Sequence, residues 1–263
     1  VNHDTSEYRR SNAAVQAQAI AAYSVGATGS GIVVGIIDSG VAADSAEFAG
    51  RISPLSRDYA GTRPLGDDGG HGTAVATVLL GARNGTSVHG IAFDATLLAL
   101  RTDTPGSCTS GASDGGGCNH ADAAMAAALD GAVAAKARVV NISLGGSPAN
   151  NALRAAIARA TAAGTIIVIA AGNDGVKNPN TAVDPDMLAQ IATDPIARGL
   201  VIIAGATDTG GALADFSNKA GIAAANYMTA LGVKVRSTDQ NGTALLYSGT
   251  SFSTPVIAGA AAL

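Results

Sequence analysis

Ile32-Val-Val-Gly-Ile-Ile-Asp38 is the stretch of sequence that decides the fold. Five of its first six residues are β-branched and none is polar, the pattern of a strand buried on both faces of a parallel sheet. The run ends at an aspartate, and a carboxylate at the end of a buried strand is costly unless it is paired. Asp38 is therefore expected either to meet a histidine cation or to serve a turn or a helix cap.

Apolar strands and Ala-rich helices alternate along the rest of the chain. Further strands are expected at 95–101, 139–144, 165–171 and 200–206, and helices at 13–23, 71–80, 121–137, 149–163 and 251–263. The segment 42–70 is expected to be irregular because Gly, Pro and Asp recur through it. This alternation predicts an α/β fold, a central mostly parallel sheet covered by helices on both faces, with the site at the carboxyl ends of its strands.

Length and composition favour one α/β domain. The 263 residues fit a single domain over residues 1–263, and 47% hydrophobic residues can fill a large core. A net charge of −4 with no basic stripe argues against a nucleic-acid partner. No apolar run approaches the ~20 residues that span a bilayer, and the polar N-terminus does not resemble a signal peptide.

The two cysteines, Cys108 and Cys118, lie in one Gly/Ser-rich stretch. A small disulfide loop, and hence an oxidising compartment, is the favoured interpretation, and two reduced surface thiols are the alternative. Two sulfurs with nearby His120 do not make a four-ligand set, so no metal site is expected.

Two glycine-framed motifs carry candidates for nucleophilic catalysis. Ser251 lies in Gly249-Thr-Ser-Phe-Ser-Thr-Pro255, at the start of an expected helix, with the proline expected in its first turn. A serine there, taken alone, is better explained as a helix N-cap. His71 lies in Gly69-Gly-His-Gly-Thr73, also at a helix start, where glycines on both sides let other groups approach the ring. A serine hydroxyl needs such a base within hydrogen-bond reach, and the base needs a third group to fix its tautomer.

Asn173 follows the expected strand at 165–171, and its amide could donate to a developing oxyanion. An asparagine in a left-handed turn is the alternative. Together with Asp38, His71 and Ser251, it completes the set of groups that acyl transfer requires.

Five motifs resemble those of the subtilisin-like serine proteases and occur in the same order as in that family: Asp38-Ser-Gly40, Gly70-His-Gly-Thr73, Ser143-Leu-Gly145, Ala170-Ala-Gly-Asn173 and Gly249-Thr-Ser251. The resemblance covers nearly the whole chain, from about residue 27. It implies a serine endopeptidase that acts on polypeptides through an acyl-enzyme, with a subtilisin-like three-layer fold.

The resemblance also assigns roles to individual residues. Catalysis falls to Asp38, His71, Ser251 and Asn173, the last with the Ser251 N–H as oxyanion hole. Substrate binding falls to Ser143, Leu144, Gly145, Ala171 and Gly172, which would pair with the substrate backbone and wall the pocket for P1, the residue before the cut bond. Asp174 is expected at the rim of that pocket, where it would modestly favour basic or polar P1 residues. The family commonly holds structural calcium, but no carboxylate cluster here has convincing ligand spacing.

Two features depart from the family pattern. Phe252-Ser253 replaces the usual Met-Ala after the nucleophile, and Phe252 is expected to alter the packing behind Ser251. The chain also stops twelve residues after Ser251, so the last helix is expected to be truncated. The opening stretch through Gly31 and the Ala-rich body resemble the protease passengers of bacterial autotransporters. That resemblance implies secretion or display at the bacterial cell surface, with a propeptide and a C-terminal translocator domain outside this chain.

Other classes fit less well. Sedolisin-like peptidases share the Gly-Thr-Ser-x-Ser-x-Pro pattern at 249–255 but use Glu and Asp in place of His, which the motif around His71 argues against. An α/β-hydrolase would need Gly-x-Ser-x-Gly and the order Ser, Asp, His, and the chain has neither. The remaining alternative is a non-catalytic, peptide-binding degenerate protease domain, and no residue of the triad is missing to support it.

Overall fold

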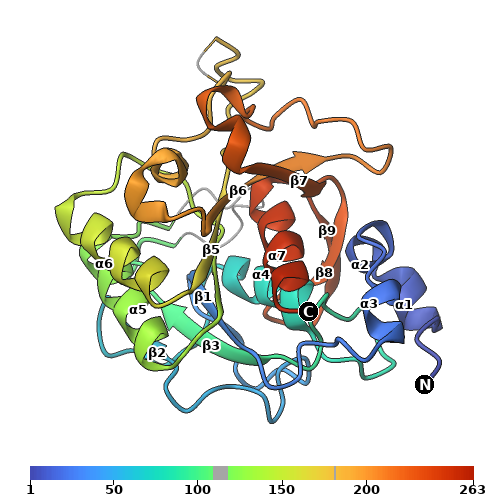
Figure 1. The fold of residues 1–263 in the computed structure, drawn as a ribbon. Helices are drawn as coiled ribbons and strands as arrows, with labels where there is room; N and C mark the ends of the chain where they lie inside the picture. The colour runs from blue at the N-terminus through green and yellow to red at the C-terminus, as the bar shows by residue number, and fades with distance from the viewer. Residues whose placement is uncertain (109–117, 181) are drawn as a thin grey trace.

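A seven-stranded sheet runs through the centre of the molecule in the computed structural model, which describes residues 1–108, 118–180 and 182–263 (Figure 1). Its strand order is β2-β3-β1-β4-β5-β6-β7, and every pairing in it is parallel. The strands are β1 (Val33–Asp38), β2 (Arg57–Asp58), β3 (Thr96–Arg101), β4 (Val139–Ile142), β5 (Ile166–Ala170), β6 (Val201–Thr207) and β7 (Tyr227–Leu231), and an antiparallel hairpin is formed by β8 (Val235–Thr238) and β9 (Ala244–Tyr247).

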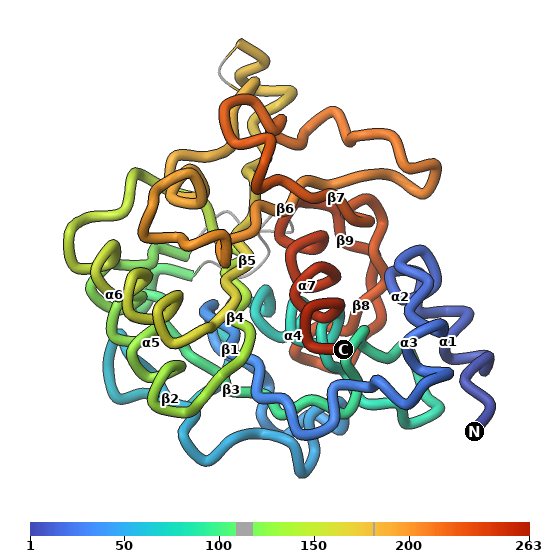
Figure 2. The backbone as a smooth tube through the Cα atoms, in the orientation of Figure 1, coloured from blue at the N-terminus to red at the C-terminus, as the bar shows by residue number. Residues whose placement is uncertain are grey.

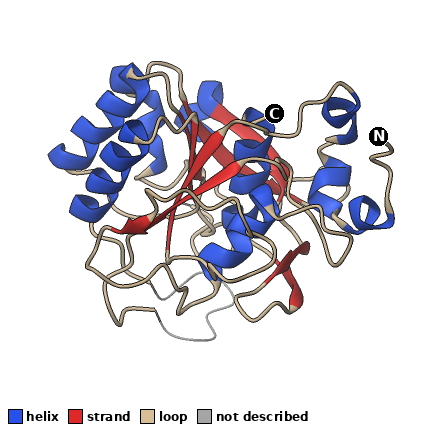
Figure 3. Ribbon diagram, turned by 90° about the horizontal axis from the view of Figure 1, so that it is seen from below, coloured by secondary structure: helices blue, strands red, loops and turns tan. Residues whose placement is uncertain are grey.

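Helices cover both faces of this sheet. In the view of Figure 1, α5 and α6 lie on one side of the strands and α4 and α7 on the other, and Figure 3 shows the strands between the helical layers. The α-helices are α1 (Ser6–Arg10), α2 (Asn12–Gln16), α3 (Ile20–Ser24), α4 (His71–Leu80), α5 (Asp122–Ala134), α6 (Asn151–Ala162) and α7 (Thr250–Ala261), and the 3₁₀ helices are η1 (Ala189–Thr193), η2 (Pro195–Ala197) and η3 (Gly221–Asn226). The structure thus confirms the α/β fold with a parallel, doubly covered sheet.

The core divides into two apolar clusters, one on each face of the sheet. The first joins α4 and α7 to the sheet through residues such as Val75 and Val256, and the second joins α5 and α6 through residues such as Leu129 and Leu153. Small side chains let α7 lie close to its neighbours, and every residue from Thr250 to Gly259 is buried. The helix that carries Ser251 is therefore one of the most enclosed elements of the molecule.

The strand order places the site. β1 pairs with β3 on one side and with β4 on the other, so the sheet changes direction of winding between β1 and β4. In open α/β sheets, ligands bind in the crevice at the carboxyl ends of the strands that flank such a switch point. Asp38 is the last residue of β1, and Ser143 comes directly after β4.

Several elements differ from the sequence-based expectation. The helix expected at 13–23 is broken into α2 and α3 at Gln18, whose φ is +53°, and α1 precedes them. Figure 2 shows these three short segments at one edge of the molecule. The strands β2, β7, β8 and β9 were not expected. β7 and β9 are largely exposed, and neither contains the Val- and Ile-rich run of β1, β4, β5 and β6.

None of the described helices is both long enough and apolar enough to cross a membrane.

Candidate active site

Asp38 is buried and pairs with His71, which is partly buried. His71 is the first residue of α4, and its Nδ1 lies 2.8 Å from Asp38 Oδ1 at the end of β1. The residue after His71 must be glycine, because a Cβ at Gly72 would collide with the Gly40 carbonyl oxygen and lie 3.2 Å from Asp38 Oδ1. That close approach of helix to strand brings the imidazole and the carboxylate into contact. Of the two expectations for Asp38, the structure shows the histidine partner.

Each partner shifts the pKa of the other so that the charged form of both, the Asp38 carboxylate and the His71 cation, is favoured. Burial raises the pKa of Asp38, but the charge of His71 and its hydrogen bond outweigh burial and leave the pKa lowered. Burial likewise lowers the pKa of His71, and the Asp38 carboxylate outweighs it, so the net pKa of the imidazole is raised. An imidazole so placed accepts a proton readily, and the resulting cation is stabilised.

Ser251 is the second residue of α7, at the amino end of that helix. Its hydroxyl donates to the Ser143 carbonyl oxygen at 3.1 Å. His71 Nε2 is buried without a hydrogen-bond partner among the described residues. The structure therefore brings Asp38 and His71 into direct contact. The Ser251 hydroxyl donates to the Ser143 carbonyl oxygen and not to His71.

Two nitrogens that carry N–H groups lie near the same space beside Gly249. A Cβ built at Gly249 would lie 3.6 Å from Asn173 Nδ2 and 3.8 Å from the Ser251 backbone nitrogen. The Asn173 amide is oriented by Thr250, whose backbone N–H and hydroxyl both donate to Asn173 Oδ1, at 2.8 and 3.0 Å. A small anion in the space that Gly249 leaves open would lie near both nitrogens.

The remaining predicted residues flank Ser251 on two sides. Ser143, Leu144 and Gly145 follow β4, while Ala171 and Gly172 follow β5, the neighbouring strand. The Gly172 N–H donates to Thr250 Oγ1 at 3.2 Å, which ties the second segment to the start of α7.

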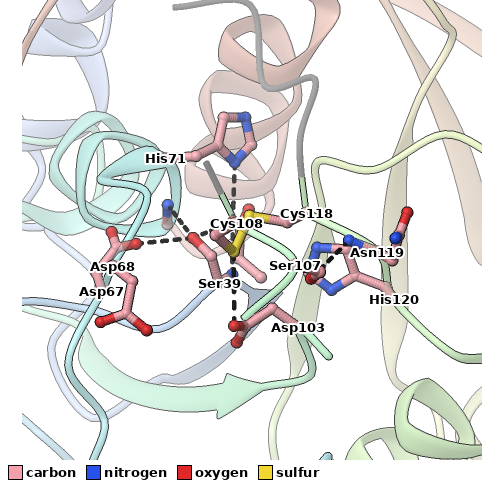
Figure 4. The surroundings of a disulfide bond; sticks show 12 residues. Ser39, Asp67, Asp68, His71, Asp103, Ser107, Cys108, Cys118, Asn119 and His120 are labelled. Atoms are coloured by element: carbon pink, nitrogen blue, oxygen red, sulfur yellow. Dashed lines mark hydrogen bonds and ion pairs between the residues drawn. A yellow bond between two sulfur atoms is a disulfide. The ribbon is translucent and has the colours of Figure 1, made fainter. Parts of the chain in front are cut away.

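The predicted disulfide between Cys108 and Cys118 is present, and residues 109–117 of its loop lie outside the described residues. It packs against the start of α4, because a Cβ at Gly69 would lie 3.5 Å from both Cys108 Cβ and Cys118 Sγ. Figure 4 shows the bridge close to His71 and Asp103.

This arrangement of residues agrees with comparisons to known proteins. A sequence model described as the subtilase family matches residues 29–263. The chain belongs to the subtilase family.

The sequences of several subtilisins align with most of the chain. Subtilisin DY of Bacillus licheniformis is 32% identical over 241 residues, 90% of this chain and 78% of that protein. Subtilisin BL of Lederbergia lenta is 33% identical over 248 residues, 94% of this chain and 80% of that protein. Subtilisin NAT of Bacillus subtilis subsp. natto is 31% identical over 249 residues, 94% of this chain, which spans only 59% of that protein's length.

At Phe252 this subtilase departs from the family pattern, and the structure shows the consequence. The Phe252 ring is 2% exposed and packs edge-on to His71, with ring centroids 5.9 Å apart. Its other neighbour is Tyr247, which stacks on it with centroids 4.7 Å apart. The aromatic side chain therefore packs against the His71 imidazole and gives it an apolar wall.

Pro255 lies deeper in α7 than expected. The helix begins at Thr250, so the proline is its sixth residue rather than part of the first turn. Proline has no N–H to donate to the carbonyl four residues earlier. That carbonyl belongs to Ser251 and accepts instead from Ser143 Oγ at 2.8 Å. Ser143 and Ser251 are thus joined by two hydrogen bonds, one in each direction.

Sequence reasoning missed Asp67, a buried carboxylate that holds the site together. It accepts from Ser39 Oγ at 2.8 Å (Figure 4). It also accepts from the Gly70 N–H and from the N–H and hydroxyl of Thr73, at 2.7 to 2.8 Å. Asp67 therefore joins the residue after Asp38 to the first turn of the helix that carries His71. An acidic residue shortly before a helix start was the available signal.

Metal ligands do not cluster in the part of the chain that the structure describes, where no three His, Cys, Asp or Glu side chains converge.

Proposed function

We propose that this chain is a serine endopeptidase that hydrolyses peptide bonds through an acyl-enzyme intermediate. The observation that carries the proposal is the pairing of His71 with Asp38 at 2.8 Å beside two donors, Asn173 Nδ2 and the Ser251 N–H, that lie near one space. Membership of the subtilase family supports it.

The residues divide the reaction as follows. His71 Nε2 accepts the Ser251 proton as the hydroxyl turns from Ser143 toward the base and attacks the substrate carbonyl carbon. Asp38 fixes the imidazole tautomer and stabilises the cation. The oxyanion is held by Asn173 and the Ser251 N–H, and His71 then returns the proton to the leaving amine. Water repeats the sequence to release the acid.

Substrate would bind as an extended strand between the two segments that flank Ser251. Ser143, Leu144 and Gly145 would form one wall, and Ala171 and Gly172 the other. Gly145 and Gly172 carry no side chain, which leaves the backbone of each wall open to the peptide at that position.

Labelling with a fluorophosphonate tests the proposal, because the probe reacts only with an activated serine. The folded protein should be labelled at Ser251, and Ser251→Ala should not be labelled. The competing function is a peptide-binding domain without catalysis, which the hydrogen bond from Ser251 to Ser143 favours. A folded chain that binds peptides but is not labelled would establish that competitor.

We further propose that residues 1–263 form a single peptidase domain that acts outside the cytoplasm, secreted or at the bacterial cell surface as an autotransporter passenger. The disulfide supports an oxidising compartment. A propeptide and a translocator domain would then belong to the same precursor. Protease accessibility of the protein on intact cells, compared with lysed cells, tests the location.

A further inference from the structure

The position of the P1 side chain follows from the site geometry, on the premise that the proposed function is correct. The acyl carbon bonded to Ser251 must have its oxygen between Asn173 Nδ2 and the Ser251 N–H. Ser251 Oγ donates a hydrogen bond to the Ser143 carbonyl oxygen, and the Gly172 N–H donates one to Thr250 Oγ1. A side chain on the acyl residue therefore enters the space between the segment after β4 and the segment after β5.

Asp186 lies between those two segments. A Cβ at Gly145 would point at its carboxylate, 3.0 Å from Oδ2, and a Cβ at Gly172 would lie 3.2 Å from Asp186 Cβ. Backbone hydrogen bonds fix it to both walls: its N–H donates to the Ala171 carbonyl at 2.7 Å, and the Gly146 N–H donates to Oδ1 at 2.8 Å. The carboxylate thus spans the walls where two glycines leave room for it.

One oxygen of this carboxylate is held by the protein and the other is not. Oδ1 accepts from Gly146 and, at 3.1 Å, from the Leu188 N–H. Oδ2 has neither a hydrogen bond nor an ion pair with any described residue, and Asp186 is half-buried. Burial raises the pKa of Asp186, and the negative charge of Asp174 adds to that effect. The carboxylate lacks the cationic partner that half-buried acids usually have.

We propose that Asp186 forms the floor of the P1 pocket and selects substrates with Lys or Arg before the cut bond. The long apolar stem of either side chain would pass between the glycine walls, and its cationic head would meet Oδ2. Asp174 has a lesser part. Its backbone N–H donates to Asn218 Oδ1. Its carboxylate is not among the three atoms nearest to a Cβ built at Gly145 or at Gly172.

Matched peptide amides that differ only at P1, Lys against Leu, test the proposal. The ratio of kcat/KM for Lys over Leu should exceed one in the wild type. In Asp186→Asn, which retains an oxygen for the Gly146 and Leu188 N–H groups, the ratio should fall roughly 10- to 100-fold, the usual worth of a charge-assisted contact. Asp130→Asn, at an exposed carboxylate that pairs with Arg159 on α6, is the matched control and should leave the ratio unchanged.

A wild-type preference for Leu, or an unchanged ratio in Asp186→Asn, overturns the proposal. If that variant does not fold, inhibition of the wild type by benzamidine compared with neutral benzamide replaces it, and equal inhibition overturns the proposal equally. Fluorophosphonate labelling does not depend on P1. Labelling without Lys preference therefore rejects the role of Asp186 alone, whereas absence of labelling rejects the proposed function and this inference with it.

Discussion

At the scale of single residues, the site depends on side chains that perform two tasks at once. Asn173 holds the start of α7 through its carbonyl oxygen and offers its amide N–H to the space beside Gly249. Ser143 likewise uses its hydroxyl to replace the hydrogen bond that Pro255 cannot make, and its carbonyl to hold the Ser251 hydroxyl. Loss of such a residue mixes a structural effect with a chemical one, so tests need variants that separate the two.

Asn173 offers such a separation. Asn173→Ala should lower kcat by about 10²–10³ with little change in KM, because an oxyanion donor acts mainly in the transition state. Asn173→Asp keeps an oxygen for the two Thr250 donors but removes the N–H, so it should lose kcat at least as severely. Steady-state kinetics on one peptide amide measure both. Full activity in Asn173→Asp would mean that Asn173 only holds the helix.

At the scale of secondary-structure elements, the first turn of α4 is the critical junction. Gly70 precedes the helix in a left-handed conformation and provides no capping side chain, and Asp67 supplies the acceptors instead. All four of its partners are donors, so the ionised form fits this place even though burial raises the pKa of Asp67. Its negative charge is among the causes that raise the pKa of His71.

The acid limb of the pH profile reports that charge. His71 must be neutral to take the proton, and its pKa is raised, so kcat/KM should rise with pH through a midpoint above 6.5, the ordinary value. Asp67→Asn removes a negative charge, lowers the pKa of His71 and should move this limb to lower pH. Asp68→Asn, at an exposed carboxylate paired with Arg101, is the matched control and should leave the limb in place. Equal shifts in both variants would reject the specific role of Asp67.

The disulfide also acts between elements, because it closes the loop after β3 and lies against Gly69 at the start of α4. For a bridge with a sequence separation of 10, the chain-entropy argument gives about 2–3 kcal/mol of stabilisation. The double variant Cys108→Ser, Cys118→Ser should lose about that free energy of unfolding in urea titrations. A wild-type sample under a reducing agent should behave like the variant, and an unchanged midpoint in both would show that the bridge adds nothing to stability.

At the scale of the whole molecule, the sequence predicted the buried elements well and the exposed ones poorly. β1 and α4 were predicted to within a residue, because a β-branched run and a Gly-Gly boundary are local signals. β7 and β8 were missed because polar residues interrupt their apolar pattern, and β9 because its short apolar run lies within a polar stretch, although Asn241-Gly242 offered a turn signal in the hairpin.

The same distinction applies to the site. The carboxyl ends of parallel strands lie at one edge of the sheet, so the sequence alone could place Asp38 and Asn173 at the same edge. Asp67 lies in an irregular segment rich in Asp and Gly, and Asp186 follows Asp184-Pro185 in another irregular segment. In neither does periodicity distinguish a buried carboxylate from an exposed one. Their roles depend on long-range packing that only the folded chain shows.

Packing across the sheet also sets a limit on α7 far from the chemistry. Gly259 lies two turns beyond Ser251, and a Cβ there would be 2.5 Å from Ile91 Cβ, in the cluster that joins α4 and α7 to the sheet. Gly259→Ala should therefore lower the free energy of unfolding by about 1–3 kcal/mol through overpacking, although alanine favours the helix. Ala260→Ser, at the exposed neighbour, should stay within about 0.5 kcal/mol. Urea titration of both variants measures the difference, and a Gly259→Ala protein as stable as the wild type would show that α7 can shift away from Ile91. Because α7 positions Ser251, a shift of α7 in Gly259→Ala should lower kcat. If α7 does not shift, Gly259→Ala should keep kcat close to the wild-type value and lose only stability.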